Sequence, residues 1–174
     1  MDLLDFEAEQ LYFDEPIDAA AKSAIDDAAD QYGDESAEHS LLRAYFIEPE
    51  HPLVLVAMYR FFYYQHRFED AMRIAERVLV LFAQRLGWPE DWRELIPEHV
   101  EQTAAASMTL LRFYLLALKG AGYLELRLGK EEQALQRLRK VVELDESDRI
   151  GAQMLIDVAR YSKGLSVVPD DAEA

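Results

Sequence analysis

Apolar residues recur along most of the chain at three- and four-residue intervals, the spacing of one face of an α-helix. Two such sets are Leu55, Met58, Tyr59, Phe62 and Ala71, Ile74, Ala75, Val78. The six prolines suit helix boundaries, where a missing amide does little harm, and no Asn-Gly hairpin dipeptide occurs. The pattern predicts an all-α chain, with helices over about 3–13, 17–31, 34–47, 52–65, 68–86, 98–128, 130–144 and 148–163.

Several residues are typical of helix ends. Gly129 is a natural helix stop, and Asp34, Ser147 or Asp148 would suit N-cap positions. A break is expected between Gly87 and Pro97. The last helix is expected to turn one apolar face inward, made of Met154, Leu155, Val158 and Tyr161.

The chain contains an internal repeat. A shift of 34 residues places Ala37, Leu41 and Ala44 on Ala71, Ala75 and Val78, and a further shift of 63 residues reaches Ala134, Leu138 and Val141. The copies cover about 18–51, 52–85 and 115–148, with an insertion over 86–114 and a capping helix over 148–163. An acidic N-terminal segment, 1–16, precedes the repeat domain 17–163, and a polar tail, 164–174, follows it.

The third copy resembles a tetratricopeptide repeat (TPR). Gly122, Gly129, Ala134 and Leu138 match the small residue, turn glycine, alanine and apolar residue of that family's pattern. The second copy is similar around Phe68 and Ala71, and the first keeps Ala37, Leu41, Ala44 and Pro49. The third copy departs from the pattern at Glu125 and Glu131, and His66 stands where the second would have its turn glycine. The resemblance implies an α-solenoid, a superhelix of helical hairpins, ended by a capping helix.

Composition narrows the class of protein. The 174 residues include no cysteine, which excludes disulfides, thiolate metal sites and a cysteine nucleophile. The four histidines lack metal-ligand spacing, and no phosphate loop or other catalytic motif occurs. The beginning of the chain is acidic, and no apolar stretch approaches the length of a membrane span. We therefore expect a cytoplasmic protein that is not an enzyme and needs no metal or cofactor.

Charge is distributed unevenly. The net charge is −16; residues 1–50 carry 15 acidic against 2 basic residues, a balance of −13, and 51–174 carry 19 against 16, a balance of −3. Nucleic acids and anionic membranes need positive surface, so neither is an expected partner. The acidic front could serve solubility, binding or autoinhibition.

Binding residues follow from the family resemblance, because the first helices of TPR hairpins line a concave groove that receives a peptide. The implied groove residues are Lys22, Arg60, Tyr63, Tyr64, Lys119, Tyr123 and Arg127. Tyrosine and arginine often dominate interface energies. The alternative is that the tyrosines belong to the core and the arginines are solvated neighbours.

Two further segments have more than one interpretation. Trp88 and Trp92 could be a packing plug or an exposed anchor for a partner. The acidic and aromatic N-terminal segment could cap the first repeat, mediate self-association or lie in the groove. The leading function is that of an adaptor binding another protein or peptide, and a homodimer is left open. The alternatives are a secretion-type chaperone and, from another class, a helical small-ligand-binding protein or enzyme.

Overall fold

The computed structural model describes residues 15–165, and every regular element within that range is helical. The all-α prediction is confirmed. The elements are α1 (Ala19–Asp30), α2 (Glu35–Ile47), α3 (Pro52–Tyr64), α4 (Phe68–Leu86), the short 3₁₀ helix η1 (Trp92–Glu94), α5 (Pro97–Ala106), α6 (Met108–Arg127), α7 (Glu131–Leu144) and α8 (Ala152–Leu165). The helix expected over 3–13 lies outside the described residues.

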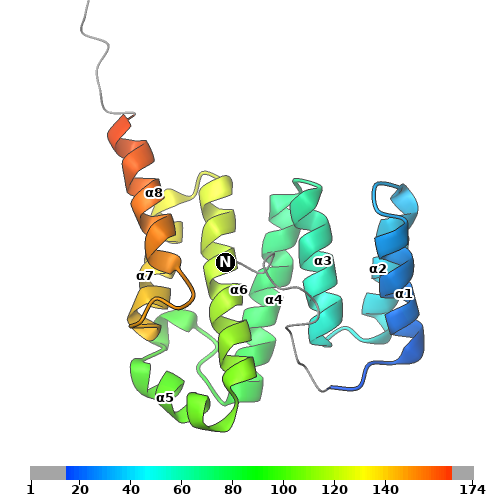
Figure 1. The fold of residues 1–174 in the computed structure, drawn as a ribbon, viewed down its shortest axis with the longest axis horizontal. Coiled ribbons are helices and arrows are strands. Elements are labelled where there is room, and N and C mark those ends of the chain that lie inside the picture. Colours follow the sequence, from blue (N-terminus) through cyan, green and yellow to red (C-terminus); the bar gives the residue numbers. More distant parts are fainter. Residues whose placement is uncertain (1–14, 166–174) are drawn as a thin grey trace, which may run out of the picture.

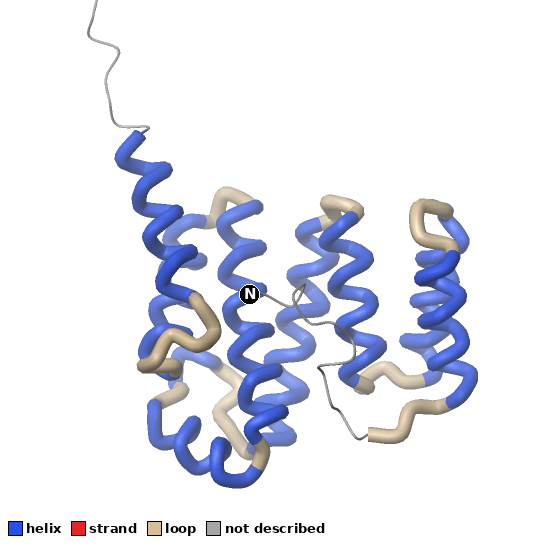
Figure 2. The backbone as a smooth tube through the Cα atoms, viewed as in Figure 1, coloured by secondary structure: helices blue, strands red, loops and turns tan. Residues whose placement is uncertain are grey.

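The long helices form a row in which the chain runs alternately up and down (Figure 1). The connecting loops lie alternately at the top and at the bottom of the helices (Figure 2). Helix α1 packs along α2, α3 along α4, and α6 along α7, while α8 packs on α7. Neighbouring pairs meet most extensively between α4 and α6.

Local signals explain most helix ends. Pro52 and Pro97 stand at the first turns of α3 and α5, where the missing amide costs no helical hydrogen bond. Gly87 and Gly129 follow α4 and α6 with φ of 66° and 73°, in the left-handed region that glycine adopts without strain. The expected break after residue 86 and the stop at Gly129 are therefore both present.

The long helix expected over 98–128 is two helices. Ser107 is extended, with φ −156° and ψ 94°, so it ends α5 and begins α6, and its hydroxyl accepts a hydrogen bond from the Leu110 amide at 3.4 Å. Helix α5 folds away from α6 at this point (Figure 1). Its Thr103 side chain is buried and hydrogen-bonded to the Trp88 indole at 3.0 Å, so packing within the insertion fixes the bend.

The last helix begins later than expected and faces differently. It starts at Ala152, where the Asp148 carboxylate accepts hydrogen bonds from the amides of Ala152 and Gln153 at 2.8 and 3.2 Å. Ala152 and Ile156 are buried and Leu155 is packed against the core. The expected inward positions Met154, Val158 and Tyr161 are exposed, which corrects the predicted face.

The core runs continuously through the row of helices. At its centre the rings of Phe82 and Phe113, both fully buried, meet edge to face at 4.6 Å between centroids, joining α4 to α6. Within the α6–α7 pair, a Cβ on Gly122 would lie only 2.9 Å from Leu138 Cγ, and Ala134 beside it has no exposed surface. Small residues therefore allow these two helices to approach closely.

We predict that Ala134→Leu lowers the free energy of unfolding by about 1–3 kcal/mol, because the added atoms must displace a packed helix. Equilibrium chemical denaturation would measure it. Gln136→Leu, at an exposed position of the same helix, is the control and should change stability by less than about 0.5 kcal/mol. Equal midpoints for both variants would show that α6 and α7 are not in close contact at Ala134.

Candidate partner-binding surface

Tyrosines from two separate helix pairs meet between α3 and α6. The Tyr63 hydroxyl donates to the Tyr123 hydroxyl at 3.2 Å, and the two ring centroids are 6.0 Å apart. The two residues are 60 apart in sequence and both are half-buried. The contact therefore joins the C-terminal ends of α3 and α6.

Arg127 extends this contact toward solvent. Its Nη1 donates to the Tyr123 hydroxyl at 3.2 Å, and its guanidinium carbon lies 4.4 Å from the centroid of the Phe68 ring. The hydrogen bond to Tyr123 raises the pKa of Arg127 further above its already high ordinary value. Arg127 is exposed, so it presents a permanent positive charge beside aromatic rings.

The remaining members come from the end of α3 and the start of α4. Tyr64 packs edge to face on Tyr63 at 5.6 Å, and 48% of its surface is exposed. Phe68 packs on Tyr63 at 5.8 Å. We call Tyr63, Tyr64, Phe68, Tyr123 and Arg127 the tyrosine–arginine cluster. Arg60, half-buried, lies one helical turn before Tyr63 and Tyr64 on α3.

Two of the residues expected in the groove lie elsewhere. Lys119 is only 2% exposed, and its ammonium donates to the Ile150 carbonyl at 3.0 Å, which ties α6 to the loop before α8. Lys22 is exposed on α1, where it pairs with Asp26 one turn along. The structure thus brings together Tyr63, Tyr64, Tyr123 and Arg127, with Arg60 close by in sequence on the same helix.

Both tryptophans of the insertion are buried. The Trp88 ring packs on Tyr114 of α6 at 4.9 Å, and the Trp92 ring contacts two guanidiniums, those of Arg93 at 4.4 Å and Arg137 at 4.8 Å from its centroid. This is the arrangement of a packing plug, because neither indole offers an exposed anchor. Burial also raises the pKa of the Tyr114 phenol above its ordinary value.

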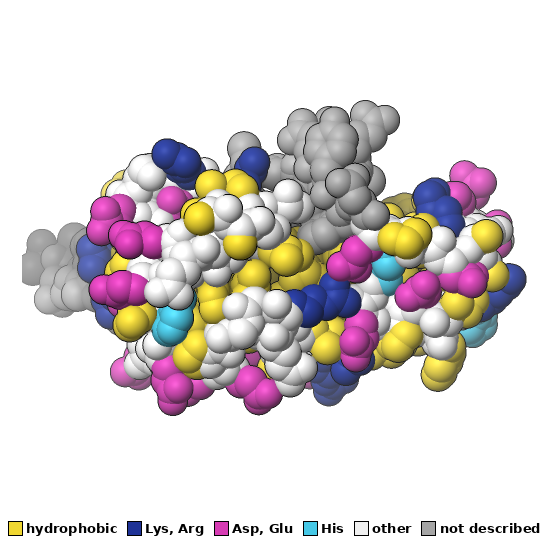
Figure 3. Space-filling model, turned by 90° about the horizontal axis from the view of Figure 1, so that it is seen from below, with side chains coloured by type: hydrophobic (Ala, Val, Ile, Leu, Met, Phe, Trp, Pro, Cys, Tyr) yellow, Lys and Arg dark blue, Asp and Glu magenta, His cyan; other side chains and the backbone are white. Residues whose placement is uncertain are grey.

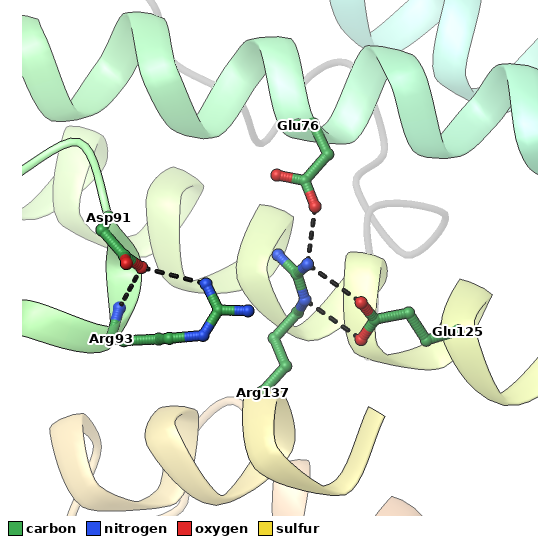
Figure 4. A network of polar contacts seen from close by, with 5 residues as sticks. All are labelled: Glu76, Asp91, Arg93, Glu125 and Arg137. Atoms are coloured by element: carbon green, nitrogen blue, oxygen red, sulfur yellow. Dashed lines mark hydrogen bonds and ion pairs between the residues drawn. The ribbon is translucent and has the colours of Figure 1, made fainter. Parts of the chain in front are cut away.

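A buried ion network beside Trp92 was not anticipated from the sequence. Arg137 of α7 forms two hydrogen bonds with the Glu125 carboxylate, at 3.0 and 3.1 Å, and a third with Glu76 of α4 at 2.6 Å (Figure 4). The Arg137 and Glu125 side chains are 5% and 8% exposed. On the loop beside them, Asp91 accepts from the Arg93 amide, and this bond lowers the pKa of the Asp91 carboxyl. The network connects α4, α6 and α7.

The lower side of the row of helices has a surface of a different composition from that of the tyrosine–arginine cluster. Seen from below, hydrophobic side chains gather in the middle of the face, basic groups lie beside them, and acidic groups are spread around them (Figure 3).

The described part of the chain contains no group of three or more His, Cys, Asp or Glu side chains placed to hold a metal ion. Between residues 15 and 165, no helix is both long and apolar enough to cross a membrane.

These features define an all-α protein of packed helix pairs, two of which are joined by an aromatic cluster with one exposed arginine. The chain is 48% identical over 175 residues to the uncharacterized 19.8 kDa protein in the nifW 5' region of Azotobacter chroococcum mcd 1, and the alignment covers 100% of this chain and 98% of the relative. The chain belongs to the same family as that protein. No protein-family model matches the chain. No solved structure matches it either.

Proposed function

We propose that this protein is a TPR-like adaptor that binds an acidic segment of another protein at the tyrosine–arginine cluster and Arg60. The observation that carries the proposal is the meeting of Tyr63, Tyr123 and Arg127 across two helix pairs, at hydrogen-bonding distance and with Arg127 exposed. Three successive antiparallel pairs, with a close α6–α7 approach at Gly122, support the TPR-like description.

The chemistry of the cluster favours an acidic and aromatic ligand. Arg127 and Arg60 provide positive charge, and Arg127 can bind a carboxylate through two parallel hydrogen bonds. The exposed part of Tyr64 offers a flat apolar surface with a polar hydroxyl. Binding of a ligand at such a site involves no chemical reaction, which fits a binding protein.

The name of the relative suggests where to look for the partner. Its gene lies in the 5' region of nifW, so the nifW product and other proteins encoded beside it are the first baits to test.

We predict that the double variant Arg60→Glu, Arg127→Glu keeps its helicity and loses partner binding by about tenfold or more, because it replaces two attractive charges with two repulsive ones. The measurement is affinity purification from the native cell with quantitative mass spectrometry, followed by titration of the best candidate. Arg139→Glu, at an exposed position of α7, is the matched control. Identical sets of captured proteins for the wild type and both variants would place binding away from the cluster.

A further inference from the structure

The first residues that the structure describes are fixed to the middle helix pair. The Glu15 carboxylate pairs with Arg85 near the end of α4 at 2.9 Å, and the Glu15 carbonyl lies 3.3 Å from His51 Nε2 at the start of α3. His51 Nδ1 accepts from the Leu53 amide, so Nε2 carries the ring proton and donates to Glu15. Arg85 also donates to the Glu50 carbonyl at 3.0 Å, which holds its guanidinium in place.

These contacts show where residues 1–14 join the described part of the chain. The Asp18 amide donates to Glu48 at the end of α2, so the chain passes from the α3–α4 pair at Glu15 to the α1–α2 pair at Asp18 (Figure 1). Residues 1–14 therefore join the described part beside α3 and α4. A cap on the outer side of α1 would require the segment to turn back over the first helix pair.

The segment is long enough to reach the tyrosine–arginine cluster. His51 and Tyr64 mark the two ends of α3, about 20 Å apart at 1.5 Å per residue. The 14 residues would span about 21 Å as a helix and about 46 Å if extended. Either conformation reaches the cluster from Glu15.

The composition of the segment matches the chemistry of the cluster. Residues 1–14 contain five acidic residues and no lysine or arginine. Their aromatic and aliphatic members are Leu3, Leu4, Phe6, Leu11, Tyr12 and Phe13. The cluster offers the cation of Arg127 and the half-exposed ring of Tyr64. The segment thus carries negative charge and aromatic rings, and the cluster carries a positive charge and aromatic rings.

We propose that residues 1–14 bind intramolecularly over α3 at the tyrosine–arginine cluster and compete there with the partner. This inference rests on the proposed function of that surface. A short tether gives an effective concentration up to about the millimolar range, so weak affinity suffices for occupancy. Exposed ion pairs are individually weak and are screened by salt, so a partner can displace the segment.

Site-specific cross-linking in the full chain tests the proposal, since the sequence contains no cysteine. Ala8→Cys is combined with Gln65→Cys, exposed next to the cluster, or with Ser23→Cys, exposed on α1. A short bismaleimide should link position 8 to 65 at least about fivefold faster than to 23, in proportion to an effective concentration in the millimolar range. Adding Arg60→Glu, Arg127→Glu should remove that preference, and adding Arg139→Glu should keep it.

Other results would overturn the inference. Faster linkage of position 8 to 23 means that the segment caps α1, and linkage only between separate chains means self-association. The companion experiment removes three of the five negative charges of residues 1–14 with Asp5→Asn, Glu7→Gln and Glu9→Gln, which should tighten partner binding severalfold. If neutralisation leaves affinity unchanged while Arg60→Glu, Arg127→Glu still abolishes capture, competition is wrong and the proposed function stands. If the intramolecular link forms but no captured protein depends on these arginines, the proposed function fails instead.

Discussion

Replacing Arg137 by methionine is expected to lower the free energy of unfolding by about 3–5 kcal/mol. Arg137 neutralises Glu125, which is itself buried, and also pairs with Glu76. Without the guanidinium, the Glu125 carboxylate would remain charged, desolvated and without its bidentate partner. The loss should appear as a large fall in the midpoint of urea denaturation at neutral pH.

Two control variants separate this network from ordinary surface charge. Arg73→Met removes an ion pair whose arginine is 75% exposed, and it should cost less than about 1 kcal/mol. The double variant Arg137→Met, Glu125→Met leaves neither buried charge and should recover most of the stability lost in Arg137→Met. If Arg137→Met were no more harmful than Arg73→Met, the network would contribute nothing to folding.

Trp88→Ala is the second variant expected to have a large effect, at about 3–5 kcal/mol of unfolding free energy. It removes a buried indole that packs on Tyr114 of α6 and hydrogen-bonds to Thr103 of α5, so the loop after α4 would lose this contact with both helices. Thermal and chemical denaturation would measure the loss. Trp88→Phe keeps an aromatic ring and loses the hydrogen bond, so its cost should be smaller, about 1–3 kcal/mol.

Ile96→Ala provides a comparison within the same insertion, because Ile96 is exposed and should tolerate the change to within about 0.5 kcal/mol. A small effect of Trp88→Ala, similar to that of Ile96→Ala, would contradict the packing of the insertion against α6.

Helix existence and most helix ends could be predicted because their signals are local. The spacing of apolar residues indicates the buried face of a helix. Gly87, Gly129 and Pro52 mark helix ends through the backbone conformation at their own positions. Ser107 gives no such signal, since serine occurs within helices as well as at caps. The bend there depends on Trp88 and Thr103, which lie 15 residues apart and meet only after folding.

The candidate surface follows from the sequence only through the family resemblance, which named Tyr63, Tyr64, Tyr123 and Arg127 together. Tyr63, Tyr64, Tyr123 and Arg127 share a cluster because the C-terminal ends of α3 and α6 meet at the contact between Tyr63 and Tyr123. Lys119 also has the right spacing, yet its ammonium finds a carbonyl 31 residues away and is buried. No local pattern distinguishes a buried lysine with a distant acceptor from an exposed one.

The buried arginine network also limits which arrangements of the helices are permitted. A shift of α7 by one turn, about 5.4 Å, would withdraw Arg137 from both carboxylates and leave charges buried. The ion network therefore fixes the register of α7 against α6 through Glu125 and against α4 through Glu76. In the variant Arg137→Met, Glu125→Met, which lacks this network, the chain should remain helical and stable. Its amide NMR spectrum should broaden, because α7 would exchange between registers.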